Sequence, residues 1–140
     1  MTFIETLSDD LDSVPGATGV NNHEGSALTE NREAMTFLMV ELKARNVFFL
    51  DSYTNSKSVA YAVAKESGMK AARRDVFLDD DDSPAVIRKQ LDELARLARK
   101  NGSAIGIGHP HSATLAELKT WLAEADELGI EIVPVSWLVK

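Results

Sequence analysis

The sequence contains no cysteine, and it has only three histidines among 140 residues. Without cysteine the chain forms no disulfide bond and offers no thiolate to a metal ion, and it carries no indication of a redox compartment. A site for a transition metal would therefore have to use imidazole and carboxylate ligands. The positions of the few histidines become correspondingly informative.

Long apolar runs and clusters of basic residues are also missing. No apolar stretch approaches the roughly 18 residues of a membrane span, and the opening Met-Thr-Phe-Ile-Glu lacks the basic and apolar regions of a signal peptide. With 22 acidic against 15 basic residues, the formal charge is −7, which argues against nucleic acid and anionic membranes as partners. We expect no membrane span and no export signal within these residues, and the compartment stays open.

What the chain does have is enough apolar residues for a hydrophobic core, at 44% of the sequence. A length of 140 residues makes one domain the default expectation. Short apolar runs predict strands at residues 17–20, 47–50, 72–78, 104–107 and 130–135. Apolar residues at helical spacing predict helices at residues 4–13, 30–45, 59–67, 83–100 and 114–128.

The order of these elements predicts an α/β fold. Each strand is followed by a polar loop, a helix and a short connection to the next strand, and right-handed crossovers of this kind require a parallel sheet. Thr29 and the capping box Thr114 to Glu117 are predicted helix starts, and Asn46 is predicted to end a helix in a left-handed conformation.

Polar side chains follow the predicted strands where each strand ends. They are Asn21, Asn22, His23, Asp51, Ser52, Asp75 or Asp79, His109 and His111. Because the carboxyl ends of parallel strands meet at one edge of a sheet, we expect these side chains to share one face. All the histidines lie in two of these loops, so the sequence predicts a site at this edge.

The imidazoles each allow two interpretations. His23 can bind a divalent metal, with a neighbouring asparagine orienting the ring, or it can simply hold its loop. His109 precedes Pro110, which restricts its backbone to an extended conformation. It is predicted to be a metal ligand, or the acid that protonates a leaving amine, with a loop-stabilising role as the alternative. For His111 a structural role in a solvent-facing loop is favoured.

The carboxylates are similarly divided. Asp51 follows three apolar residues, and a carboxylate there can bind metal, orient a histidine or hold a loop amide. Asp75 follows two arginines, so an ion pair with Arg73 or Arg74 is the simplest interpretation. Ser52 suits the capping of a turn.

Four motifs carry a resemblance to a known family. They are Val-Asn-Asn-His-x-Gly-Ser at 20–26, Phe-Phe-Leu-Asp-Ser at 48–52, Arg-Asp-Val-Phe-Leu-Asp at 74–79 and Ile-Gly-His-Pro at 107–110. In this order they resemble the divergent polysaccharide deacetylase family, relatives of the NodB-type carbohydrate esterases. The resemblance implies parallel β/α units forming part of a distorted barrel of about seven strands.

The resemblance also implies a metal-dependent hydrolase that acts on C–N or ester bonds of acetylated carbohydrate. The cofactor would be a divalent metal, zinc or another first-row cation. The implied metal ligands are His23 and His109. The implied catalytic residues are His109, Asp75 and Asp51, and the implied substrate-binding residues are Asn21, Asn22 and Ser52.

The motifs match only the later part of the family's domain. Family members usually begin with a strand ending in paired aspartates and a second strand carrying another histidine. We therefore expect residues 1–140 to be a single, partial domain that lacks the aspartate strand. Family members are often exported.

Two alternatives stay open. The chain can be a non-catalytic carbohydrate-binding or interaction module that retains the deacetylase fold. It can also be one piece of a larger whole, since five parallel strands cannot close such a barrel. That interpretation predicts self-association, or pairing with a separate N-terminal half.

Overall fold

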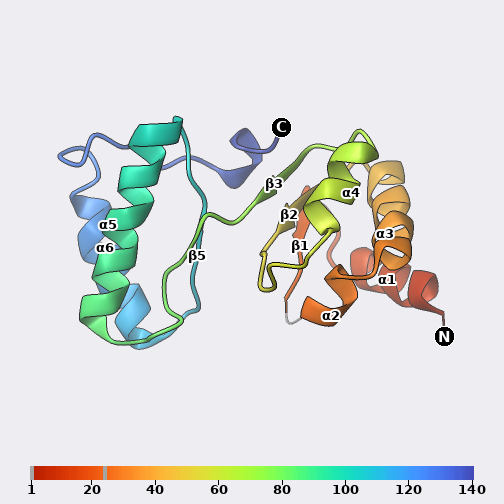
Figure 1. The fold of residues 1–140 in the computed structure, drawn as a ribbon, viewed down its shortest axis with the longest axis horizontal. Coiled ribbons are helices and arrows are strands. Elements are labelled where there is room, and N and C mark those ends of the chain that lie inside the picture. Colours follow the sequence, from red (N-terminus) through yellow and green to blue (C-terminus); the bar gives the residue numbers. More distant parts are fainter. Residues whose placement is uncertain (1, 24) are drawn as a thin grey trace. The chain divides into compact units, whose positions relative to one another are not determined.

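The computed structural model describes residues 2–23 and 25–140, which fold as two compact units (Figure 1). The first unit is Met1–Arg73 with Leu138–Lys140, and the second is Arg74–Trp137. Each unit contains parallel strands joined by helices. The predicted α/β class, built from parallel β/α units, is confirmed.

The first unit is built on a three-stranded parallel sheet with the order β1-β2-β3. Its strands are β1 (Gly19–Asn21), β2 (Phe48–Asp51) and β3 (Ala71–Arg73). Its helices are α1 (Phe3–Asp12), α2 (Ser26–Thr29), α3 (Arg32–Ala44) and α4 (Ala60–Glu66). Gly19 pairs with Phe48, and Phe49 pairs with Ala71. Because the backbone of Lys140 exchanges two hydrogen bonds with that of Ala71, at 3.0 and 3.1 Å, the last residues belong to this unit.

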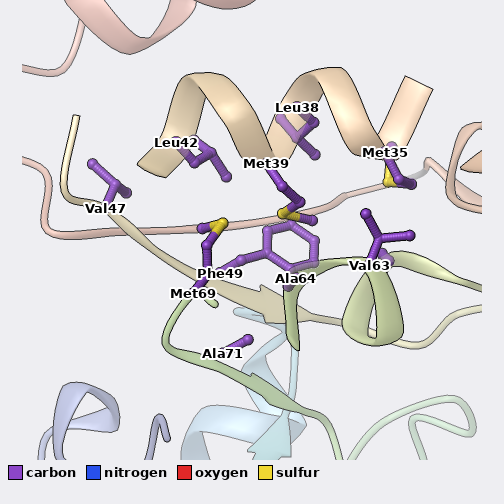
Figure 2. Close-up of a cluster of buried hydrophobic side chains, with 11 residues drawn as sticks. Met35, Leu38, Met39, Leu42, Val47, Phe49, Val63, Ala64, Met69 and Ala71 are labelled. Atoms are coloured by element: carbon purple, nitrogen blue, oxygen red, sulfur yellow. The ribbon is translucent and has the colours of Figure 1, made fainter. Parts of the chain in front are cut away.

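The core of the first unit forms between α3 and the sheet (Figure 2). Apolar side chains three and four residues apart give α3 one buried face: Met35, Leu38, Met39 and Leu42. This face packs with Phe49 of β2 and with Val63 and Ala64 of α4. Strand β2 is buried from residue 49 to residue 51 with no alternation, as expected for a strand covered on both faces.

The second unit has a two-stranded sheet and two long helices. Strand β4 (Val76–Phe77) pairs in parallel with β5 (Gly106–Ile107), and helices α5 (Pro84–Asn101) and α6 (Ser112–Ala123) lie side by side (Figure 1). A short 3₁₀ helix, η1 (Val135–Trp137), follows. The second unit has its own cluster of buried apolar side chains: Val76, Leu78, Ile87, Leu91, Ala95 and Trp121.

Two predicted strands differ from the observed ones. The predicted strand at 72–78 is two short strands, β3 and β4, separated by Arg74 and Asp75, and each pairs in a different sheet. The predicted strand at 130–135 is wrong, because residues 130–134 have irregular structure and η1 begins at Val135. The segment is apolar enough for a strand, but neither sheet pairs with it.

Helix ends were predicted with mixed success. Asn46 adopts the expected left-handed conformation, with φ 56°. The predicted cap at Thr29 is wrong, because the short helix α2 ends there and Asn31 caps α3 by accepting a hydrogen bond from the amide of Ala34 at 3.0 Å. The predicted capping box at Thr114 is also wrong, since α6 begins at Ser112. None of the described helices is long and apolar enough to cross a membrane.

The core of the first unit makes a direct prediction about stability. Leu42 of α3 is fully buried, whereas 62% of Val40, on the same helix, is exposed. Replacing Leu42 by alanine should lower the free energy of unfolding by about 2 to 5 kcal/mol, because it removes buried methyl groups and leaves a cavity. The matched change Val40→Ala should cost roughly 0.5 kcal/mol or less. Denaturant unfolding of the two variants measures both, and equal losses would contradict this core.

Candidate functional site

In the second unit, the register of the two parallel strands places an acid beside a histidine. Val76 pairs with Gly106 and Phe77 with Ile107. Asp79 and His109 each lie two residues beyond their strands, so the same offset brings them opposite one another. The Asp79 side chain is fully buried, whereas 44% of the His109 side chain is exposed. The strands thus end in a buried carboxylate in contact with an accessible imidazole.

Asp79 holds the loop after β5 through both of its oxygens. Oδ1 lies 2.9 Å from Nδ1 of His109, and Oδ2 accepts a hydrogen bond from the backbone N–H of His109 at 2.6 Å. The hydroxyl of Thr114, at the start of α6, also donates to Oδ2, at 2.8 Å. The approach is close at Gly108, where a Cβ would lie 3.4 Å from Oδ2 and 3.2 Å from the Thr114 methyl group. Both the backbone and the ring of His109 are therefore fixed by one carboxylate.

The same contacts set the charge of Asp79. Burial raises the pKa of the Asp79 carboxyl, but the hydrogen bonds from the His109 ring, the His109 backbone N–H and the Thr114 hydroxyl outweigh it and leave the pKa below its ordinary value. Asp79 is therefore ionised near neutral pH. An ionised carboxylate at Nδ1 favours the tautomer of His109 with its proton on that nitrogen.

His111 completes a cluster of three groups that can hold a metal ion. Its ring centroid lies 5.7 Å from that of His109, and one ligand atom from each of Asp79, His109 and His111 lies within 4.8 Å of the others. His111 is exposed and occupies the position before α6, where its backbone N–H donates to the carbonyl of His109 at 2.8 Å. The two histidines that flank Pro110 therefore place their imidazoles close together.

Asp75, the predicted catalytic carboxylate, lies at the other end of β4 from Asp79. Its Oδ2 accepts the backbone N–H of Ile105 at 2.8 Å, and its own N–H donates to the carbonyl of Ile105 at 2.8 Å. These bonds fasten the start of β4 to the chain before β5. The fold therefore brings Asp79, and not Asp75, to His109, and a catalytic role for Asp75 stays a prediction.

In the first unit, three predicted substrate-binding residues form one hydrogen-bonded network at the ends of β1 and β2. Asn21 Nδ2 donates to Ser52 Oγ at 3.0 Å, and Ser52 Oγ donates to the carbonyl of Asn22 at 2.7 Å. The backbone N–H of Ser52 donates to Asn22 Oδ1 at 2.8 Å. Nδ2 of Asn22 is buried with no acceptor within residues 2–23 and 25–140. The structure thus brings these three residues together, and their role toward substrate stays a prediction.

Asp51 is fully buried at the end of β2 and is engaged by its own loop. Oδ1 accepts the backbone N–H of Tyr53 at 2.8 Å, and Oδ2 accepts the hydroxyl of Ser58 at 2.8 Å and the backbone N–H of Tyr61 at 3.2 Å. Of the three interpretations made from sequence, the one in which Asp51 holds loop amides describes these contacts. Its catalytic role is untested and stays a prediction.

His23 follows the network of Asn21 and Asn22 and is exposed. The sequence predicts that His23 and His109 meet at a common edge as metal ligands. Those two histidines belong to different units, and their joint site stays a prediction.

Sequence reasoning gave Asp79 too little weight and assigned His111 a structural role. One signal could have identified Asp79, because Phe77-Leu78-Asp79 repeats the Phe49-Leu50-Asp51 pattern at the end of a strand. Thr114 gave no such signal. Its spacing to Glu117 fits a capping box, and only the packing of α6 against the β4 loop shows its hydroxyl on Asp79.

The contacts of Asp79 predict how stability depends on pH. Because its pKa is lower in the folded chain than in the unfolded chain, the carboxyl stabilises the fold above the ordinary aspartate value of 3.8, and this contribution is lost as pH falls through the lower, folded pKa. Asp79→Asn should therefore destabilise the chain at pH 7, by about 1 to 3 kcal/mol, and should flatten the loss of stability below pH 4. Chemical unfolding measured between pH 2 and pH 7 tests this.

The next residue supplies the control for that experiment. Asp80 is exposed and lies in the same acidic loop. Asp80→Asn should leave the unfolding free energy within roughly 0.5 kcal/mol of the wild type at pH 7. A pH profile of Asp79→Asn that parallels the wild type would show that Asp79 is not the linked group.

Comparison with known proteins agrees with these motifs. The sequence model of the divergent polysaccharide deacetylase family matches residues 2–139. An uncharacterised protein of Haemophilus influenzae is 46% identical over 114 residues, which cover 81% of this chain and 41% of that protein. The uncharacterised protein YibQ of Escherichia coli K12 is 45% identical over 109 residues, covering 78% of this chain and 34% of YibQ. The chain thus spans less than half the length of these curated relatives.

A solved structure shows the same fold. The crystal structure of the uncharacterised protein ATU2773 from Agrobacterium tumefaciens C58 matches with a TM-score of 0.91 and 32% sequence identity. The match covers 99% of this chain and 58% of that protein. With a family match along almost its whole length, the chain belongs to the divergent polysaccharide deacetylase family.

Proposed function

We propose that this chain is the part of a metal-dependent carbohydrate deacetylase that supplies histidine ligands for the metal ion. The observation that carries this proposal is the buried Asp79 carboxylate, which fixes both the ring and the backbone of His109. A histidine that only stabilised its loop would not require a buried, ionised partner directed at Nδ1. Membership of the family supports acetylated carbohydrate as the substrate class.

The cluster Asp79, His109 and His111 fits a divalent first-row cation. Two imidazoles and one carboxylate are the ligand types that zinc accepts, and their ligand atoms lie within 4.8 Å of one another. Both oxygens of Asp79 already accept hydrogen bonds from protein groups. We therefore assign Asp79 the role of orienting His109, as carboxylates do behind metal-bound histidines. His109, through Nε2, and His111 would hold the ion.

A bound divalent ion would polarise the carbonyl of an acetamide or ester and lower the pKa of its water. The chain's own contribution is the placement of the ion's ligands. With Nδ1 held by Asp79, His109 would present Nε2 to the ion. In the first unit, Asn21, Asn22 and Ser52 would contact the sugar, and Asp51 and Asp75 would act as supporting carboxylates, each within its own unit.

Metal binding and turnover test this proposal together. Titration with Zn²⁺ or Co²⁺ should show one site, and His109→Ala or His111→Ala should weaken it by a factor on the order of ten to a hundred. His109→Ala should also abolish release of acetate from acetylated chito-oligosaccharides. Asp79→Asn should weaken metal binding less than His109→Ala does, because it removes the group that orients the ring and leaves the ligand atom in place.

Asp82→Asn, a change at an exposed acid of the same loop, is the matched control and should match the wild type in both assays. Tight metal binding that is insensitive to His109 and His111 would contradict the cluster as the metal site. Binding of oligosaccharide without any metal-dependent release of acetate would favour the non-catalytic module instead.

A further inference from the structure

Arg73 ends strand β3 with its guanidinium against two tyrosine rings. Its central carbon lies 4.7 Å from the ring centroid of Tyr53 and 5.7 Å from that of Tyr61. The residue is exposed at the carboxyl end of the sheet β1-β2-β3, where Asp51 pairs with it across the strands. The three side chains come from three different segments, so the arrangement is a product of the fold.

The buried carboxylate of Asp51 positions both tyrosines. Oδ1 accepts the backbone N–H of Tyr53, and Oδ2 accepts that of Tyr61. Tyr53 is held in a left-handed conformation, with φ 51°, and its hydroxyl donates to the carbonyl of Ser56 at 3.2 Å. A non-glycine residue in this region of φ is uncommon and needs such support. The two rings are therefore placed before any ligand arrives.

The side-chain N–H donors of Arg73 form no hydrogen bond within residues 2–23 and 25–140. Six other arginines contact acceptors: Arg32, Arg45, Arg74, Arg88, Arg96 and Arg99. In that part of the chain, the guanidinium of Arg73 lies against two rings and forms no hydrogen bond or ion pair. Stacking uses the faces of a guanidinium and leaves its in-plane N–H donors directed outward. In a chain of net charge −7, a guanidinium that forms no ion pair within the described residues suits an external anion.

We propose that Arg73, flanked by Tyr53 and Tyr61, binds the carboxylate of an acidic saccharide. This inference rests on the proposed carbohydrate function and specifies the charge of the sugar. A guanidinium fork matches a carboxylate in a bidentate pair. One cation in an acidic chain suits the single charge of a carboxylate better than the double charge of a phosphate. Asn21, exposed at the same edge of the sheet, would supply a polar partner for the sugar hydroxyls.

Binding measured without turnover tests this inference on the full chain. Titration calorimetry would compare digalacturonic acid with the neutral sugar N,N′-diacetylchitobiose. The acidic disaccharide should bind more tightly, and its affinity should fall as salt is raised. Arg73→Gln should weaken its binding roughly tenfold or more, because a charge-assisted pair is lost, and should leave binding of the neutral sugar unchanged. Arg73→Lys keeps the charge without the fork and should show an intermediate loss.

Arg74→Gln is the matched control. Its guanidinium lies 3.8 Å from the ring centroid of Phe77 and hydrogen-bonds the Asp75 carbonyl, so the change should leave affinity for the acidic sugar at the wild-type value. Thermal unfolding of each variant shows whether the fold persists. If Arg73→Gln unfolds, Arg73→Lys decides the question.

Equal affinity for the acidic and neutral disaccharides, or no loss in a folded Arg73 variant, would overturn the inference. Displacement of digalacturonic acid by inorganic phosphate at lower concentration than by acetate would also overturn it. The outcome is separable from the proposed function. Arg73-dependent binding without metal-dependent turnover would leave this inference standing alone, whereas turnover without any preference for acidic sugar would remove only this inference.

Discussion

Both units depend on a buried carboxylate at the end of a parallel strand. Asp51 and Asp79 each follow a Phe-Leu pair, and both are buried. Hydrogen bonds from protein groups replace those that water would make: from the following loop for Asp51, and from the loop after β5 and the start of α6 for Asp79. A buried charge is costly unless it is fully hydrogen-bonded. Each loop therefore has few alternative conformations, because any that released the carboxylate would leave it unpaired.

The two carboxylates differ in what they hold. Asp51 holds backbone amides of its own loop and of the start of α4, and two tyrosine rings are placed as a result. Asp79 holds a residue on the adjacent strand end, and that residue is an imidazole. The same local pattern thus produces a fixed aromatic surface in one unit and a charged acid–histidine pair in the other. The difference lies in which residue the register places opposite the acid.

The family and this geometry describe different levels of function. Family membership accounts for the order of the four motifs and for the parallel β/α units. It does not specify which acid contacts His109. The hydrogen bonds of the structure identify that acid as Asp79. The relatives are more than twice as long as the matched region.

The sequence by itself determined most of the helices, the parallel β/α order, the family and the position of His109 after a strand. These follow from periodicity and from motifs of adjacent residues, which local physics and spacing express directly. The tertiary structure decided the partners. Residues 72–78 form parts of two strands because each half pairs with a different neighbouring strand, and residues 130–135 pair with none. His109 contacts Asp79 rather than Asp75 because β4 and β5 pair 30 residues apart, the same separation as that between Asp79 and His109. Pairing across 30 residues is a property of packing, and no local pattern encodes it.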